Sequence, residues 1–277
     1  SPPAPALRAG YVYHNGRYAA AGAVIEAARG RSWAEFMTER IFEPLGMGRT
    51  VALGRMTESM DNVASPHYRV DGEVRVIDNA WVDSVAAAGS VWSSVNDMAR
   101  WVAFMLSDGE VNGVRLLEPA THAELLTPQI VVPRGSFYPT TQVTEPTWTT
   151  YALGWFQHDW GAWDLSFHTG SIDGMVAIAG LLPEEGIGVY VLGNLDHSEV
   201  RHALMYEALE RWGGFETGRD WRRELKQLYD GIAAEQAAAL DRALERRVPD
   251  TQPSLPLDAY AGTFHDQLFG TVEVRVE

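Results

Sequence analysis

Residues 151–193 read YALGWFQHDWGAWDLSFHTGSIDGMVAIAGLLPEEGIGVYVLG, and this stretch decides the fold. It contains four apolar or alternating runs of strand length, at 151–159, 162–168, 175–182 and 187–193. The turns between these runs are short, at 160–161, 169–174 and 183–186. Short turns join only antiparallel neighbours, so the stretch predicts an antiparallel meander.

Helical patterns lie on both sides of the meander in the sequence. We expect helices at five places: a buried one at 18–29 closed by Gly30, one from Ser32 to Pro44, one opened by Ser94, one at 198–212 with Ser198 as N-cap, and one at 218–247. Residues 107–150 are rich in Pro, Thr and Gly and predict an irregular surface segment with a short helix near 118–126. The predicted fold class is α+β, an antiparallel sheet flanked by helices.

The composition excludes several classes of function. The 22 basic and 37 acidic residues give a net charge of −15, so we expect no nucleic-acid partner. No apolar run reaches the roughly 18 residues that a membrane-spanning helix needs. The chain has no Cys, which excludes disulfides, thiolate catalysis and Cys-ligated zinc. The eight His residues show no metal-ligand spacing, and we expect neither a metal nor another cofactor.

The two ends of the chain are unusual. It begins at Ser1-Pro2-Pro3 without a signal-peptide pattern, and residues 270–277 alternate like a strand that is cut off. We therefore expect sequence to be missing at both ends. Three prolines, at 249, 253 and 256, indicate a linker before a β-rich unit that begins near Leu257.

Two short motifs remain once P-loop and G-x-S-x-G signatures are found to be absent. Tyr13-His14-Asn15 lies directly before a predicted helix, and His168-Thr169-Gly170 lies at the end of a predicted strand. Each motif has a structural alternative: a turn with Asn15 in the left-handed region, and a hairpin turn at 168–170. A generic α+β domain in which both motifs are accidental is also open.

Three longer stretches resemble the penicillin-recognising serine hydrolases, which include class C β-lactamases, D-Ala-D-Ala carboxypeptidases and related esterases. They are YVYHNGRYAAAGAVIEAARGRSWAEFMTERIFEPLGMGRT (11–50), AAAGSVWSSVNDMARWVAFML (86–106) and HTGSIDGMVAIAGLLPEEGIGVYVLGN (168–194). The resemblance implies a β-lactamase/transpeptidase-like fold. The sequence LDAYAGTF from Leu257 further resembles the start of a small β-barrel domain that often follows such hydrolases.

The resemblance divides the chain into three parts. Residues 1–213 would be a partial β-lactamase/transpeptidase-like domain, 214–256 a helical linker, and 257–277 the start of a C-terminal lipocalin-like β domain.

The resemblance also implies roles for the residues of the two motifs. Tyr13 would match the family's tyrosine, which passes protons between nucleophile and leaving group, and Asn15 would bind the substrate amide. His168 stands where many members have lysine, and would donate to Tyr13 or to a substrate carboxylate. Thr169, which stands before Gly170 in the same motif, would supply a hydroxyl to the substrate. The Ser171 N–H would be one half of the oxyanion hole.

The family's nucleophile motif, S-x-x-K, does not occur in the 277 residues, because Lys226 is the only lysine and Arg223 stands three residues before it. We expect the nucleophile in sequence that precedes Ser1. The resemblance then implies a serine hydrolase that forms an acyl-enzyme with an amide, a D-amino-acid peptide or an ester, in the periplasm or outside the cell. The alternative is a non-catalytic binding remnant of the same fold, which an N-terminal fragment of the same protein would cover as partner.

Overall fold

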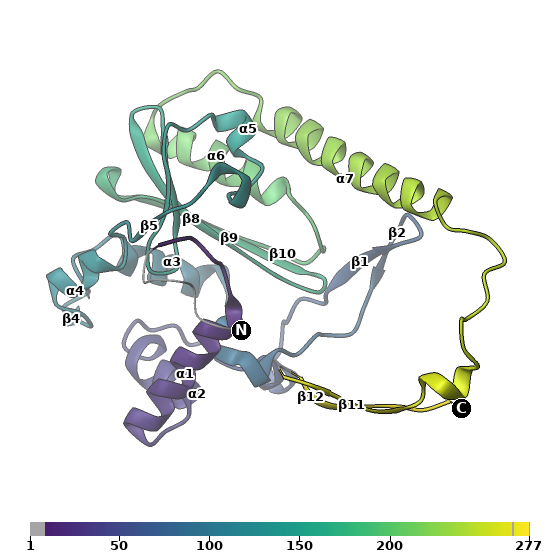
Figure 1. Ribbon diagram of the computed structural model, residues 1–277. Helices are drawn as coiled ribbons and strands as arrows, with labels where there is room; N and C mark the ends of the chain where they lie inside the picture. The colour runs from purple at the N-terminus through teal and green to yellow at the C-terminus, as the bar shows by residue number, and fades with distance from the viewer. Residues whose placement is uncertain (1–8, 268, 277) are drawn as a thin grey trace. The chain divides into compact units, whose positions relative to one another are not determined.

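The computed structural model describes residues 9–267 and 269–276, in two compact units. The larger unit ends at Tyr229, and the smaller one begins at Asp230. Figure 1 shows the course of the chain.

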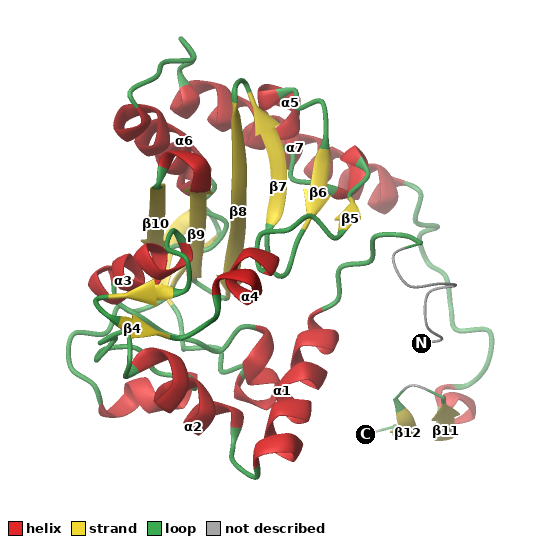
Figure 2. Ribbon diagram, turned by 90° about the vertical axis from the view of Figure 1, so that its left-hand side faces the viewer, coloured by secondary structure: helices red, strands yellow, loops and turns green. Residues whose placement is uncertain are grey.

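The larger unit is built on a six-stranded antiparallel sheet with the order β10-β9-β8-β7-β6-β5 (Figure 2). Its strands are β5 (Ile130–Val131), β6 (Thr149–Tyr151), β7 (Phe156–Trp160), β8 (Trp163–Ile172), β9 (Met175–Leu182) and β10 (Ile187–Gly193). Every strand pairs with its neighbour in sequence, which confirms the predicted meander and the α+β class.

Two strand boundaries differ from the prediction. The run 151–159 is two strands, because the chain turns between Tyr151 and Phe156, where Gly154 takes a φ of 92°. Strand β8 continues to Ile172, and the turn comes only at Asp173 and Gly174. The motif at 168–170 therefore lies inside a strand, and the hairpin-turn alternative is wrong.

Helices cover both faces of this sheet. Helices α6 (Val200–Gly213) and α7 (Trp221–Glu245) pack into one core cluster, and α2 (Trp33–Met37) and α3 (Val95–Met105) into another. Strand β9 contributes to both clusters in alternation, with Ile178 and Leu182 in the first and Ala179 and Leu181 in the second. The alternation shows that the two clusters lie on opposite faces of the sheet.

The helix boundaries follow the capping residues. Helix α1 (Asn15–Arg29) begins after His14, whose Nδ1 accepts from the Gly16 N–H at 2.9 Å, and it ends at Gly30 with a φ of 64°. Asn15 is thus helical, not left-handed as one alternative required. The expectation of a buried helix is wrong, since only Gly22 of α1 is buried. Glu199 and not Ser198 is the N-cap of α6.

A buried carboxylate joins two of the three stretches that carry the family resemblance. Asp97, in the first turn of α3, is 3% exposed. It accepts from the Arg49 N–H at 2.7 Å and the Thr50 hydroxyl at 2.9 Å, and pairs with Arg100 at 2.9 Å. These contacts fasten residues 49–50 to α3.

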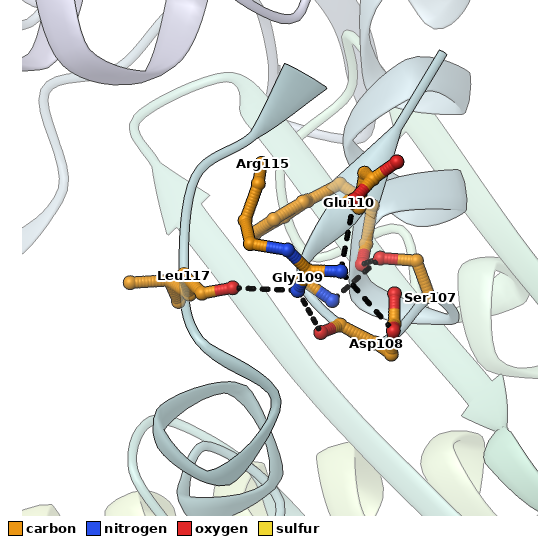
Figure 3. A network of polar contacts seen from close by, with 7 residues as sticks. Ser107, Asp108, Gly109, Glu110, Arg115 and Leu117 are labelled. Carbon is orange, nitrogen blue, oxygen red and sulfur yellow. Dashed lines mark hydrogen bonds and ion pairs between the residues drawn. The ribbon is translucent and has the colours of Figure 1, made fainter. Parts of the chain in front are cut away.

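A second polar network orders the chain after α3 (Figure 3). The Arg115 guanidinium binds the Glu110 carboxylate at 2.8 Å and the Asp108 and Leu117 carbonyl oxygens at 3.2 Å. It stabilises the hairpin of β3 (Glu110–Val111) and β4 (Val114–Arg115). The network has a structural role in the surface segment predicted at 107–150. The rest of that segment holds α4 (Pro119–Glu124), where the short helix was expected, and α5 (Thr141–Thr144).

Two further hairpins complete the described chain. Strands β1 (His67–Val70) and β2 (Glu73–Val76) pair in the larger unit, and β11 (Gly262–Asp266) and β12 (Gly270–Val274) pair in the smaller one. The predicted lipocalin-like domain at 257–277 remains a prediction, as do the other domain boundaries. Within 9–267 and 269–276, no helix is long and apolar enough to cross a bilayer.

Candidate active site

The loop before α1 and strand β8 meet at one end of the sheet. The ring centroids of Tyr13 and His168 are 6.0 Å apart, and Tyr13 stacks on Phe156 at 6.3 Å. Tyr13 is 44% exposed, and His168 is half-buried. Two predicted site residues that are far apart in sequence thus lie side by side, with one of them open to solvent.

Asn15 lies two residues after Tyr13, as the first residue of α1. It is exposed, like Tyr13. The helix start therefore presents both residues of the first motif at the surface, and of the two only Tyr13 has a ring contact with His168.

His168 is held by hydrogen bonds at both ring nitrogens. Its Nδ1 lies 2.7 Å from the Thr169 carbonyl oxygen, and its Nε2 lies 3.2 Å from the Tyr151 hydroxyl. Burial lowers the pKa of His168 below its ordinary value, although the bond to the Thr169 carbonyl acts in the opposite sense. The imidazole is therefore neutral at pH 7, and its single N–H is directed at Thr169 rather than at Tyr13.

The Tyr13 phenol keeps its proton in this environment. Burial raises its pKa, and the neighbouring phenols of Tyr138 and Tyr18 raise it further. None of the groups that shift this pKa is a cation. Proton transfer through Tyr13 at neutral pH therefore requires a positive charge from another group.

Thr169 is bound from the segment 107–150. The Tyr138 hydroxyl and Thr169 Oγ1 are 2.7 Å apart. Tyr138 also borders a hollow of about 460 Å³ that is lined by residues between Arg134 and Glu145. The segment without a readable motif thus reaches the second motif through Tyr138, while residues of this segment alone line the hollow.

The outer half of β8 has one free edge. Strand β7 pairs with β8 only as far as Phe167, whereas β9 pairs with β8 as far as Ile172. Among the described residues, the backbone from His168 onward is therefore unpaired on the side away from β9. Gly170 and Ser171 lie on this part of the strand, and both are exposed.

A buried arginine on α6 holds the same part of β8 from behind. Arg201 is 6% exposed, and its Nη1 donates to the Gly170 carbonyl at 2.8 Å and to Ser171 Oγ at 2.9 Å. The same nitrogen reaches the carbonyl of Ala177, the β9 partner of Gly170, at 3.4 Å. Both carbonyls therefore point between the two strands.

The orientation of the Ser171 N–H follows from peptide planarity. In a trans peptide, the Gly170 C=O and the Ser171 N–H point in opposite directions. Since the carbonyl points toward β9, the N–H points toward the free edge. This is the orientation that an oxyanion donor at Ser171 needs.

Arg201 is accompanied by two further polar groups, the partly buried Glu199 and the buried His202. Its Nη2 lies 3.3 Å from Glu199, and Glu199 lies 3.0 Å from Nδ1 of His202. Burial by itself would raise the pKa of Glu199, but His202 and Arg201 outweigh it and lower that pKa. Glu199 is therefore ionised and balances the Arg201 charge under the strand.

Three of these residues were not predicted from the sequence: Tyr138, Tyr151 and Arg201. Their letters form no motif with the residues they contact, which lie 17 to 31 positions away. Lys226, the single lysine of the sequence, is exposed on α7. In the described parts of the chain, no group of three or more His, Asp or Glu side chains is arranged to hold a metal ion.

Known proteins share this fold and sequence pattern. The beta-lactamase family profile matches residues 1–211. The unguisins hydrolase ungD of Aspergillus violaceofuscus is 26% identical over 300 residues, which cover 100% of this chain and 51% of that protein. Protein flp of Staphylococcus aureus (strain MW2) is 25% identical over 198 residues, covering 69% of this chain and 34% of that protein.

Two solved structures are similar. The octameric penicillin-binding protein homologue from Pyrococcus abyssi has a TM-score of 0.64 at 24% identity, over 76% of this chain and 44% of that chain. The D-amino acid amidase from Ochrobactrum anthropi SV3, complexed with L-phenylalanine amide, has a TM-score of 0.55 at 25% identity, over 73% and 56%. The chain thus spans about half the length of these relatives or less. Because the profile matches most of its length, the chain belongs to the beta-lactamase family.

Proposed function

We propose that this chain is part of a serine hydrolase that cleaves amide or ester bonds through an acyl-enzyme. The observation that carries the proposal is the Tyr13 ring, which lies 6.0 Å from the ring of His168, the residue at which the free edge of β8 begins. Acyl transfer needs a proton carrier and an N–H donor around one reacting carbonyl. Tyr13 and the Ser171 N–H supply these two roles.

The nucleophile is proposed to lie outside the 277 residues. S-x-x-K is absent from them, and the raised pKa of Tyr13 calls for a cation that the surrounding phenols do not supply. The lysine of an S-x-x-K motif would provide this charge. The length of the relatives, about twice that of this chain in the case of the unguisins hydrolase, is consistent with such a segment.

The reaction divides into two balanced steps. The serine oxygen attacks the substrate carbonyl while its proton passes through Tyr13 to the leaving amine or alcohol, and the ester of the acyl-enzyme forms as the substrate bond breaks. Water then cleaves the ester and returns the proton to the serine. The Ser171 N–H stabilises the oxyanion in both steps, Asn15 binds the substrate amide, and Thr169 contributes its hydroxyl.

We propose a substrate without a carboxylate next to the scissile bond. His168 is neutral and fully engaged, and the buried Arg201 is bound to Gly170, Ser171 and Glu199, so neither offers a free positive charge. The amidase likeness agrees with a neutral amide or small peptide. We expect this activity in the periplasm or outside the cell.

The test compares two lengths of the protein with an activated ester, p-nitrophenyl acetate. The protein with its upstream reading frame should release one equivalent of nitrophenol in a burst, and the 277-residue chain should not. Tyr13→Phe in the longer protein should slow acylation by about 10²- to 10⁴-fold. Tyr68→Phe, at a partly exposed tyrosine on β1, is the matched control and should have no effect.

Two results would contradict the proposal. A stoichiometric burst from the 277-residue chain would show that the nucleophile lies within it. No acylation of the longer protein by esters or amides would favour the alternative, a non-catalytic binding module whose partner is the N-terminal segment.

A further inference from the structure

We infer that Tyr151 is a positioning residue that holds His168 as the neutral tautomer with its proton on Nδ1, and that Tyr18 aligns Tyr151 from helix α1. The inference concerns the protonation state and orientation of one imidazole. Its catalytic consequence rests on the proposed function, but its structural content does not.

The direction of each hydrogen bond follows from the chemistry of the partners. A carbonyl oxygen only accepts, so Nδ1 of His168 must carry the proton that it shares with the Thr169 carbonyl at 2.7 Å. In a neutral imidazole, Nε2 is then an acceptor, and the Tyr151 hydroxyl at 3.2 Å must donate to it.

The chain of hydrogen bonds continues to the helix that carries Asn15. Because the Tyr151 O–H donates its hydrogen bond to His168, the Tyr151 oxygen is the acceptor in its contact with the Tyr18 hydroxyl at 3.2 Å. Burial raises the pKa of Tyr151, and the contact with Tyr18 raises it further. Tyr151 therefore remains a donor over the whole physiological range. This series of hydrogen bonds links α1 to strand β6 and strand β6 to strand β8, and each hydroxyl donates toward His168.

Aromatic rings face His168 from three elements, while its β9 partner is Ala179. Tyr13 faces it from the loop before α1 at 6.0 Å, Tyr151 from β6 at 6.1 Å, and Phe156 from β7 at 5.5 Å between ring centroids. No charged side chain contributes to the shift of its pKa. The tautomer is therefore selected by the two hydrogen bonds and not by a neighbouring charge.

The protein contains an internal control for this assignment. His158 on β7 makes the same local bond, from Nδ1 to the carbonyl of the following residue, Asp159, at 2.7 Å. Its Nε2 has no hydrogen-bond partner among the described residues. The two imidazoles thus share the bond at Nδ1 and differ in the contact at Nε2, which His168 makes with Tyr151.

The consequence for the proposed reaction is geometric. Tyr151 occupies Nε2, so the His168 ring cannot turn this nitrogen toward Tyr13 or the substrate. The ring face instead lies beside Tyr13, with an angle of 31° between the two planes. His168 then shapes the pocket wall as a neutral group, where many family members place a charged lysine.

The experiment is ¹⁵N NMR of the histidine side chains in the 277-residue chain, with His158 and His168 assigned by single substitution. Nε2 of His168 should give the downfield shift of an unprotonated nitrogen, and Nδ1 that of a protonated one. In Tyr151→Phe, the preference for this tautomer should fall by roughly three- to tenfold, because one hydrogen bond is lost. The His168 pKa should rise, because a bond to its neutral form is lost.

The remaining variants make the result specific. Tyr18→Phe should change the His168 signals in the same direction by less, and the His158 signals should stay unchanged in both variants. A protonated Nε2 in the wild type, or unaltered His168 signals in Tyr151→Phe, would overturn the inference. In the longer protein, Tyr151→Phe should also shift the pH profile of acylation. Failure to acylate at all would count against the proposed function while the NMR result stands.

Discussion

His158 and His168 lie on adjacent strands and look alike locally, yet their surroundings differ. Each donates from Nδ1 to the next carbonyl oxygen at 2.7 Å, and burial lowers the pKa of both. His158 is 0% exposed and makes edge contacts with the rings of Phe137 and Phe167. His168 is half-buried, beyond the last residue that β7 pairs with, and its Nε2 is bound by a tyrosine.

Under the proposed function, the difference separates a structural histidine, His158, from a histidine of the candidate site, His168. The local bond to the following carbonyl is common to both and carries no functional information. The contact at Nε2, together with the free edge of the strand, marks His168. The following predictions test this contrast, and the largest expected effect comes first.

Replacement of Arg201 should weaken strand β8 and leave strand β7 unchanged. Arg201→Ala leaves the largely buried Glu199 without its arginine and frees the Gly170 carbonyl, so we expect a loss of about 3 kcal/mol in the free energy of unfolding. In hydrogen exchange, the amides within residues 168–172 that face β9 should lose protection, whereas those of 156–160 should not.

The control for this variant is Arg222→Ala. Arg222 forms an exposed ion pair with Glu207 at 2.8 Å, so its loss should change stability by less than about 1 kcal/mol. Equal loss of protection in both strands of Arg201→Ala would show that the arginine supports the sheet as a whole and not the motif strand.

Acid should destabilise the protein through His158. Burial lowers the pKa of His158 from 6.5 to about 4. As the pH falls below 6.5, the unfolded chain binds a proton that the folded chain does not, so stability is lost until the pH reaches about 4. This drop corresponds to about 3 kcal/mol.

The measurement is urea unfolding at pH 7 and pH 4.5 for the wild type and His158→Leu. The variant should lose less stability between the two pH values, because the group that takes up the proton is gone. Equal losses in the two proteins would show that His158 is not buried in its neutral form.

Removal of the Thr169 hydroxyl should have the smallest effect. Thr169→Val keeps the carbonyl that His168 uses and removes only the bond to Tyr138, at an expected cost of about 1 kcal/mol. The NMR signals of both histidines should stay in place. A changed His168 tautomer would mean that the side chain of Thr169, and not its backbone, controls the imidazole.

Much of the fold could be predicted from the sequence because its signals are local. Short turns determined the antiparallel order of the strands, and the Ser32–Glu35 capping box and Gly30 marked helix ends that the structure contains. The break at 152–155 was missed because only the φ of Gly154 reveals it. The burial of α1 was also wrong, since an Ala-rich pattern does not say whether another element covers it.

The candidate site was only partly predictable. Motifs in the sequence predict Tyr13, Asn15 and the residues at 168–171 as site residues, and these remain predictions. Tyr138, Tyr151 and Arg201 act through contacts between distant parts of the chain, and no spacing in the sequence encodes such contacts. The neutral state of His168 likewise depends on burial and on a partner from another strand.

The Asp97 contacts have a consequence for how related sequences should vary. Asp97 accepts from the backbone of Arg49 and the hydroxyl of Thr50, so the two positions 97 and 50 form one hydrogen-bonded pair across two motifs. A relative that replaces the aspartate by an apolar residue would take the acceptor from the Arg49 N–H and leave the Thr50 hydroxyl with Ser93 Oγ alone of its two hydrogen-bond partners. Positions 50 and 97 should therefore change together in evolution. A chimera that takes the stretch 11–50 from one parent and the stretch 86–106 from another should fold less well than either parent.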